Sequence, residues 1–322
     1  MQLKLDLKDR RILNELDKNA RQSNSELAKK VGLKKNIVNY RTKQLEKKQV
    51  IKGYNTIIDS SKLGYYFFRI YIKLQSIDPE KEKQFKENLM NNPEITWVGT
   101  LTGQWNIVLG FHTLSMRKFR KEWADILNKS RTIIQEYNIS ILVDYIHYRK
   151  AYLINEEKDT TEISWNISSS SEKEAFDNID LKIIKLLLTN ARIPIIKIAQ
   201  KLNMSATAIV YRIKKLEKKQ IIQGYRADIN YELLGYEYYK TDIQLNDLSI
   251  IPQLEEFAKT NPNIVYVDKT IGGSDFEFDV EVKNLKQYLK IINTLIKKFS
   301  DKIRSYNYFR FLRYDKITYL PI

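Results

Sequence analysis

Apolar residues recur near the start of the chain at the three-to-four-residue spacing of an amphipathic helix, and the same pattern returns from Asp180 onward. In each copy this pattern predicts three helices, the third of which covers residues 35–48 in the first copy. Ser23, three residues before Glu26, forms the capping-box signature that begins the second helix. Ser205 is expected to cap the third helix of the second copy. The spacing therefore predicts a helix-turn-helix domain in each copy.

The two copies match without an insertion over their first part. At a constant offset of 171 residues, Asp9 falls on Asp180 and Tyr65 falls on Tyr236. Chance similarity does not hold one register over this length, so the chain contains an internal repeat.

After each third helix, residues 50–54 and 221–225 have the composition of a strand, which we interpret as the wing of a winged helix-turn-helix domain. The remainder of each copy alternates between strand and helix patterns in the order β-α-β-β-α-β, which predicts a ferredoxin-like domain. The fold class is therefore α+β, with two winged helix-turn-helix domains and two ferredoxin-like domains in tandem repeat. The expected strands and helices are residues 65–74, 79–90, 95–101, 105–111, 115–128 and 133–148 in the first copy, and 236–245, 251–260, 264–270, 276–282, 285–299 and 303–314 in the second.

A polar segment separates the two halves. Residues 155–178 carry seven acidic and two basic residues, a run of serines and no periodic apolar face. This composition predicts a flexible acidic linker, which at about 3.4 Å per residue reaches on the order of 80 Å and lets the halves pair side by side. The expected domains are a winged helix-turn-helix at 1–56, a ferredoxin-like domain at 63–153, the linker at 154–178, a second winged helix-turn-helix at 179–227 and a second ferredoxin-like domain at 234–322.

The net charge of +16 is concentrated in the helix-turn-helix segments. Residues 8–52 hold 14 basic and 5 acidic residues, and residues 179–223 hold 10 basic and 2 acidic residues, so these two segments carry +9 and +8 and the rest of the chain −1. A protein that binds a polyanion concentrates its cations where phosphates approach. Solvated lysine-rich helices are the alternative, and they explain the lysine content but not its segregation.

Composition excludes several classes of site. The chain has no cysteine and only two histidines, His112 and His147, so we expect no disulfide, no metal site and no cofactor. The most apolar stretch, residues 63–74, is interrupted by Arg69 and Lys73 and is too short to cross a membrane. The first residues lack an apolar signal segment, so we expect a cytoplasmic, nucleoid-associated protein without a membrane partner.

The residues of the first half resemble those of a known family. The matching pattern is Glu26-Leu27-Ala28, Val31-Gly32-Leu33, Val38, Arg41, Leu45-Glu46, Val50-Ile51, Gly53-Tyr54 and Leu63-Gly64, followed by the β-α-β-β-α-β order. This pattern resembles the Lrp/AsnC (feast/famine) family of transcriptional regulators, and the second half repeats the resemblance. The resemblance implies a winged helix-turn-helix that binds double-stranded DNA, and a ferredoxin-like domain that dimerises and often binds an amino acid or similar small effector. Two copies in one chain imply intramolecular pairing of the halves as a pseudo-dimer, and further assembly into a higher homo-oligomer stays open.

The two expected recognition helices begin differently. Ser205 agrees with the family pattern, whereas the first copy has Lys34 and Lys35, which place two cations where the helix dipole disfavours them. Phosphates at this end of the helix would offset that cost, and solvation of both lysines is the alternative. The residues expected to contact DNA are Lys34, Lys35, Asn36, Asn39, Tyr40, Arg41, Lys43, Lys47 and Lys48 in the first copy, and Ser205, Ala206, Thr207, Val210, Tyr211, Arg212, Lys214, Lys218 and Lys219 in the second.

The outward faces of these helices also differ, because Asn36 and Asn39 in the first copy correspond to Thr207 and Val210 in the second. Asparagine forms paired hydrogen bonds with adenine, whereas apolar and threonine side chains favour the thymine methyl group. The two halves are therefore expected to prefer an asymmetric site, with half-sites one helical turn or a multiple of it apart.

Arg41 and Arg212 have two interpretations: they contact phosphates, or they orient helix packing through Glu46 and Glu217.

In the family, a Gly-x-x-Asp turn between the second and third ferredoxin-like strands lies near the effector. The corresponding residues are Gly103 and Asn106 in the first copy, and Gly272 and Asp275 in the second. Only Asp275 supplies a carboxylate for an ammonium group, so one competent site is expected if a ligand binds here. The alternative is a hairpin turn in which Asn or Asp caps its own backbone.

Two other functional classes are alternatives to a sequence-specific regulator. Related double-copy proteins decarboxylate siroheme, but they carry Arg-Phe-Gly where this chain has Lys52-Gly53-Tyr54 and Gln223-Gly224-Tyr225. His112 and His147 have no counterpart in the second copy, so we expect strand-face or surface histidines, no catalytic residue and no enzyme. An architectural chromatin protein with low sequence specificity is the more serious alternative, and the unlike recognition helices argue against it.

Overall fold

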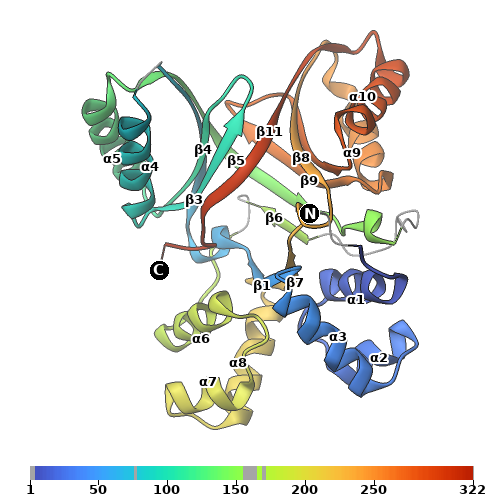
Figure 1. Ribbon diagram of the computed structural model, residues 1–322. Coiled ribbons are helices and arrows are strands. Elements are labelled where there is room, and N and C mark those ends of the chain that lie inside the picture. Colours follow the sequence, from blue (N-terminus) through green and yellow to red (C-terminus); the bar gives the residue numbers. More distant parts are fainter. Residues whose placement is uncertain (1–3, 76–77, 155–164, 169–171, 322) are drawn as a thin grey trace.

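The computed structural model describes residues 4–75, 78–154, 165–168 and 172–321, and these form two helix-turn-helix domains below a large sheet with helices on its outer faces (Figure 1). In the described residues, no helix combines the length and apolar character needed to cross a bilayer.

The first helix-turn-helix domain consists of α1 (Leu7–Lys18), α2 (Asn24–Val31) and α3 (Lys35–Lys47). The second repeats this order with α6 (Asn178–Thr189), α7 (Ile195–Leu202) and α8 (Ala206–Lys218). The capping box predicted at Ser23 is present, and α2 ends at Gly32, whose φ of +65° favours glycine. Ile12, Leu27 and Val38, one from each helix, are fully buried in the small core between the three helices.

The predicted wing strands exist, but each pairs with the strand of the other copy and not with a second strand of its own domain. The strand β1 (Ile51–Ile58) pairs antiparallel with β7 (Ile222–Ile229) of the other copy. The loop after the first helix of each copy also binds the strand of the other copy. The N–H of Ala20, after α1, donates to Tyr225 O in β7 (2.8 Å), and the N–H of Ala191, after α6, donates to Tyr54 O in β1 (2.9 Å). The two helix-turn-helix domains therefore share one two-stranded sheet.

Both ferredoxin-like domains have the predicted order of elements. The first contains β2 (Tyr66–Leu74), α4 (Pro79–Asn91), β3 (Ile95–Thr102), β4 (Ile107–Thr113), α5 (Met116–Ser130) and β5 (Ile134–His147). The second contains β8 (Glu237–Leu245), α9 (Ile251–Thr260), β9 (Ile264–Ile271), β10 (Phe276–Val282), α10 (Leu285–Phe299) and β11 (Ile303–Ile317). Short 3-10 helices lie between some of these elements: η1 (Ser60–Leu63) before β2, η2 (Ala151–Leu153) after β5 and η3 (Leu248–Ile250) before α9.

The two ferredoxin-like domains form one sheet because their last strands are long enough to pair twice. The first part of β5 pairs with β2 of its own domain, and its last part pairs with β9 of the other domain. In the same way β11 pairs first with β8 and then with β3. The resulting nine-stranded sheet has the order β2-β4-β3-β11-β8-β10-β9-β5-β6, and the additional β2–β5 pairing closes it into a ring. The helices cover the outside of this ring, so the inner faces of the two domains face each other (Figure 1).

Part of the expected flexible linker is ordered as a strand. Trp165–Ser168 forms β6, which pairs with Asp144–His147 of β5. The indole of Trp165 lies against Gly224 in β7, where any Cβ atom would collide with the ring. The linker therefore contacts both the ring of strands and the strand pair below it. Residues 172–178 are also held in place, because Glu174 N donates to Lys62 O (2.8 Å) and Asp177 caps α6. Residues 155–164 and 169–171 lie outside the described residues.

Candidate nucleic-acid interface and inter-domain cavity

The two recognition helices, α3 and α8, lie in the part of the molecule below the ring of strands (Figure 1). The predicted outward residues are exposed in both, and the exposed fractions of Tyr40 (64%) and Tyr211 (68%) show that even the aromatic positions lie open. The helix starts differ as expected: the side chain of Ser205 accepts a hydrogen bond from Ala208 N, whereas Lys34 makes no side-chain cap. The remaining outward residues, Lys35, Asn36, Asn39, Lys43, Ala206, Thr207, Val210 and Lys214, are also exposed.

Arg41 and Arg212 both pair with aspartates at the start of the first helix of their own domain. Arg41 Nη1 lies 2.7 Å from Asp6 Oδ2 and 2.8 Å from Asp9 Oδ1, at the start of α1. Arg212 makes the equivalent pairs with Asp177 (2.8 Å) and Asp180 (2.7 Å). Both arginines thus join the third helix to the first.

The packing interpretation for these arginines was right in kind, but the expected glutamate partners were wrong. Glu46 instead accepts a hydrogen bond from Tyr54 OH, and Glu217 accepts one from Tyr225 OH, each at 2.6 Å. These two carboxylates anchor the strand that follows the helix and do not reach the arginine.

The lysines at the ends of the recognition helices differ in exposure and in their contacts within the protein. Lys47, Lys48 and Lys218 are exposed. Lys219, which occupies the position of Lys48 in the second copy, donates to Ala175 O (2.6 Å) and lies 3.2 Å from Glu174 Oε2. The segment that precedes α6 therefore holds this one lysine, and the charge offered to DNA differs between the halves.

An amide network reaches the first recognition helix from the second copy. Arg192 Nη2 donates to Asn24 Oδ1 (3.1 Å), and Asn24 Nδ2 donates to Asn39 Oδ1 (3.2 Å). The second copy has Ile195 at the position of Asn24, which cannot make these bonds. Sequence reasoning missed Asn24 and Arg192, because the contact joins residues 168 apart in the chain.

The turns predicted to hold an effector have the same geometry in both copies. Asn106 Oδ1 accepts a hydrogen bond from Leu74 N (2.8 Å), and Asp275 Oδ2 accepts one from Leu245 N (2.7 Å). Gly103 and Gly272 both have positive φ, +120° and +85°, as the tight turn requires. These side chains cap the ends of the neighbouring strands β2 and β8 and not the backbone of their own turn, so the predicted self-capping was wrong in its partner.

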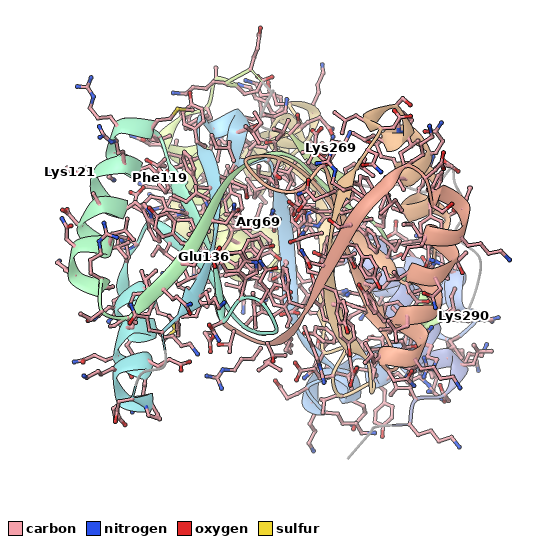
Figure 2. The ribbon with its side chains drawn as sticks, turned by 90° about the horizontal axis from the view of Figure 1, so that it is seen from above. Arg69, Phe119, Lys121, Glu136, Lys269 and Lys290 are labelled. Carbon is pink, nitrogen blue, oxygen red and sulfur yellow. The ribbon has the colours of Figure 1, made fainter. Side chains whose placement is uncertain are left out.

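A cavity of about 150 Å³ lies between the inner faces of the two ferredoxin-like domains. Figure 2 shows Arg69, one of its lining residues, between the helices of the two halves that carry Phe119 and Lys290. This cavity could not be predicted from the sequence, because its walls come from strands of both copies. Among its lining residues are Trp97, Tyr145, Tyr266, Tyr314, Lys240 and Asp268.

Both histidines lie on strands, as one of the two alternatives predicted, but they are buried and line this cavity, so the surface alternative was wrong. His112 makes hydrogen bonds with Thr96 Oγ1 (2.7 Å) and Ser60 Oγ (3.2 Å), and burial lowers its pKa to about 3. Burial, with Arg226 and Lys150 nearby, also lowers the pKa of His147. Both imidazoles are therefore neutral at physiological pH.

Charged side chains of the two copies meet next to the cavity. Arg69 of the first copy pairs with Asp268 and Glu277 of the second. Lys240 pairs with Asp268 and lies 3.2 Å from both Glu277 and Asp279. Asp242 lies opposite Glu277 in the β8–β10 register. We call the four carboxylates the acidic cluster: Asp242, Asp268, Glu277 and Asp279.

The acidic cluster belongs to the second copy alone. When the turns at Gly103 and Gly272 are aligned, Asp268, Glu277 and Asp279 fall on Gly99, Val108 and Gly110 of the first copy. Those two glycines instead admit the rings of Phe311 and Phe67, which a Cβ atom would displace. The alternation of acidic and apolar residues in β10 is the sequence signal that could have revealed an acidic inner face.

Sequence comparisons agree with the helix-turn-helix geometry. The model of the winged helix-turn-helix DNA-binding family matches residues 5–52, and that of the AsnC-type helix-turn-helix domain matches residues 176–217. A helix-turn-helix transcriptional regulator of Pyrococcus furiosus is 48% identical over 61 residues, which are 19% of this chain and 41% of that protein. The transcriptional regulator AzlB of Bacillus subtilis is 32% identical over 41% of this chain and 85% of its own length.

The leucine-responsive regulatory protein of Haemophilus influenzae is 33% identical over 38% of this chain and 76% of its own length. Among solved structures, the siroheme decarboxylase NirDL has a similar fold, with a TM-score of 0.65 and 12% sequence identity. The alignment covers 98% of this chain and 94% of the NirDL chain. That likeness concerns the fold alone. Both helix-turn-helix segments match family models, and two regulators align over most of their own length. The chain therefore belongs to the Lrp/AsnC family of transcriptional regulators.

Proposed function

We propose that this protein binds double-stranded DNA on the nucleoid as a covalent pseudo-dimer and reads an asymmetric site. The observation that carries the proposal is the contrast between α3 and α8. Their scaffold contacts are the same, as the paired bonds of Arg41 and Arg212 illustrate, but their exposed residues differ. Equal scaffolds with unequal reading faces favour two different half-sites.

The spacing of the two helices is supported by reciprocal contacts. Arg21 Nη1 donates to Ala191 O (2.6 Å), and Arg192 Nη1 donates to Ala20 O (2.9 Å). Together with the β1–β7 strand pair, these bonds hold the helix-turn-helix domains at one separation. A fixed separation corresponds to a fixed half-site spacing on the duplex.

The exposed lysines are the proposed phosphate contacts. Lys47, Lys48 and Lys218 lie open at the carboxyl ends of the recognition helices, and Lys34 and Lys35 lie at the start of α3. Phosphate contacts supply affinity and orientation without sequence information. The proposed base contacts are Asn36, Asn39, Thr207 and Val210.

An architectural protein would bind all sequences alike, and a selection experiment separates the two functions. Sites selected from a random DNA library are compared with random duplexes at about 0.15 M salt. A sequence-specific regulator binds its selected site on the order of a thousandfold or more tightly than random DNA. Equal affinities would reject the proposed function in favour of the architectural one.

The likeness of fold to a siroheme decarboxylase raises an enzymatic alternative. A cavity of about 150 Å³ holds a molecule the size of benzene, whereas a tetrapyrrole carries four rings. The size of the cavity therefore favours a regulator over a siroheme decarboxylase. A titration with siroheme, monitored by the absorption spectrum of siroheme, should show no complex. A saturable spectral change would support the enzymatic alternative.

A further inference from the structure

We propose that the cavity between the two halves binds a small organic ammonium ion, held by aromatic rings and by the acidic cluster. The size of the cavity sets the class of ligand. About 150 Å³ is the volume that accommodates one benzene-sized molecule. The ligand is therefore a monocyclic or short branched amine.

The charges beside the cavity favour a cation. Arg69 and Lys240 face Asp268, Glu277 and Asp279, so negative charge is in excess even while Asp242 holds its proton. Burial raises the pKa of Asp279 to about 6 and that of Asp242 to about 7, and neighbouring carboxylates add to both shifts. A bound cation would supply the missing positive charge.

One wall atom is available to meet that cation. Asp268 is 6% exposed and lines the cavity, and within the described part of the chain its Oδ1 atom has no hydrogen-bond partner. Its Oδ2 atom is the one that Arg69 and Lys240 contact. A buried acceptor without a partner is costly, and an ammonium N–H beside it would remove that cost.

The aromatic wall suits an ammonium group with an organic skeleton. The rings of Trp97, Tyr145, Tyr266 and Tyr314 line the cavity and present π faces that attract cations. His147 lies between Tyr145 and Tyr266, with ring centroids at 4.2 and 4.9 Å. Neither of its ring nitrogens has a hydrogen-bond partner among the described residues, so the neutral imidazole can accept a second N–H of the ligand.

The position of the cavity links it to the DNA-binding layer, and this step rests on the proposed function. Ile58, the last residue of β1, and Tyr319 both line the cavity. Tyr319 OH also accepts a hydrogen bond from Asn55 in β1 (3.1 Å). A ligand that contacts this floor would therefore act on the strand pair that joins the two helix-turn-helix domains.

Isothermal titration of the full chain, without DNA, tests the site directly. The probes are benzylammonium, benzyl alcohol and benzoate, which share one ring and differ in charge. We expect benzylammonium to bind with one equivalent per chain and at least tenfold more tightly than the other two. Equal binding of the alcohol or benzoate, or no binding of benzylammonium, would overturn the proposal while leaving the proposed DNA binding intact.

Two variants locate the site. Asp279→Asn removes a lining carboxylate and should weaken benzylammonium binding about tenfold. Asp275→Asn, at the turn before the same strand and outside the cavity wall, should leave binding unchanged. If Asp279→Asn fails to fold by thermal melting, Leu142→Trp fills the cavity without a change of charge and should abolish binding. Retained affinity in Leu142→Trp, or loss of binding in Asp275→Asn alone, would place the ligand elsewhere and reject the cavity.

Discussion

Arg69 joins the two halves at the level of single residues. Its guanidinium is 2% exposed and pairs with Asp268 and Glu277, which belong to the other copy. Burial alone would raise the pKa of Glu277, but Arg69 and Lys240 lower it to about 2, so this carboxylate stays ionised. A buried charge of this kind depends on its partner, because removal of one member leaves the other unpaired.

We expect Arg69→Met to destabilise the protein by about 3–5 kcal/mol, since it leaves two buried carboxylates with one fewer cation. The free energy of unfolding is measured in a denaturant titration. Arg313→Met is the matched control, because Arg313 pairs with Asp315 but its side chain is 67% exposed. That pair should contribute less than about 1 kcal/mol. Equal losses in the two variants would contradict the assignment of Arg69 as the joining residue.

Asp242 makes stability depend on pH in an unusual direction. Burial, with Glu277 nearby, raises its pKa to about 7, so the folded state holds a proton that the unfolded chain has already lost above pH 4. The contribution of this group to stability is therefore greatest at low pH and falls as pH rises from about 4 to 7.

Asp242→Asn removes this titration. Relative to the variant, the wild-type protein should lose roughly 2–4 kcal/mol of unfolding free energy between pH 4 and pH 8. Denaturant titrations of both proteins across this range measure the difference. Two parallel stability curves would show that Asp242 does not retain its proton.

Residue identity could be predicted where local sequence decides the structure. The capping box at Ser23 and the cap at Ser205 follow from a few neighbouring positions, and both are present. The partners of Arg41 could not be predicted, because Asp6 and Asp9 lie more than 30 residues away along the chain. Asn24 was missed for the same reason.

At the level of elements, the two recognition helices offer matched pairs of lysines. Lys48 is exposed, whereas its counterpart Lys219 is held by Ala175 and Glu174. We expect Lys48→Ala to lower the slope of log affinity against log salt by about 1, as loss of one phosphate contact does. Lys219→Ala should have a smaller effect. Identical salt slopes for both variants would contradict this asymmetry.

Asn24 tests the reading of bases by α3. Its amide holds Asn39 through a hydrogen bond of 3.2 Å, so we infer that it positions that side chain. Asn24→Ile introduces the residue that the second copy has at this position. Discrimination at one base of the first half-site should fall by about 1–3 kcal/mol, without a change in salt slope. Binding to a set of single-base site variants measures this, and a uniform loss over all sites would indicate a phosphate role instead.

The elements themselves were largely predictable, because each helix and strand has its own hydrophobic period. The segment 276–282, for example, was expected as a strand and forms β10 with the same bounds. The pairing of strands was not predictable from periodicity, which does not say which edge a strand joins. For this reason the sequence predicts β1 as a wing, and it does not predict the closure of the ring by β5 and β11.

At the level of the whole molecule, the two copies of the repeat differ in the residues on their inner faces. The first copy contributes Arg69 and an aromatic inner face, and the second contributes the acidic cluster. The strand β6, from the segment between the copies, covers Gly224 in β7. Complementary charge on the inner faces favours pairing of unlike halves within one chain over pairing of like halves from two chains.

The difference between the two recognition helices can be tested directly by DNA binding. An asymmetric site selected from a random library is titrated beside two palindromes, each made by repeating one half-site at the same spacing. Because α3 and α8 present different residues, the asymmetric site should bind at least about tenfold more tightly than either palindrome. Equal or tighter binding of either palindrome would contradict the claim that the fused copies read different sequences.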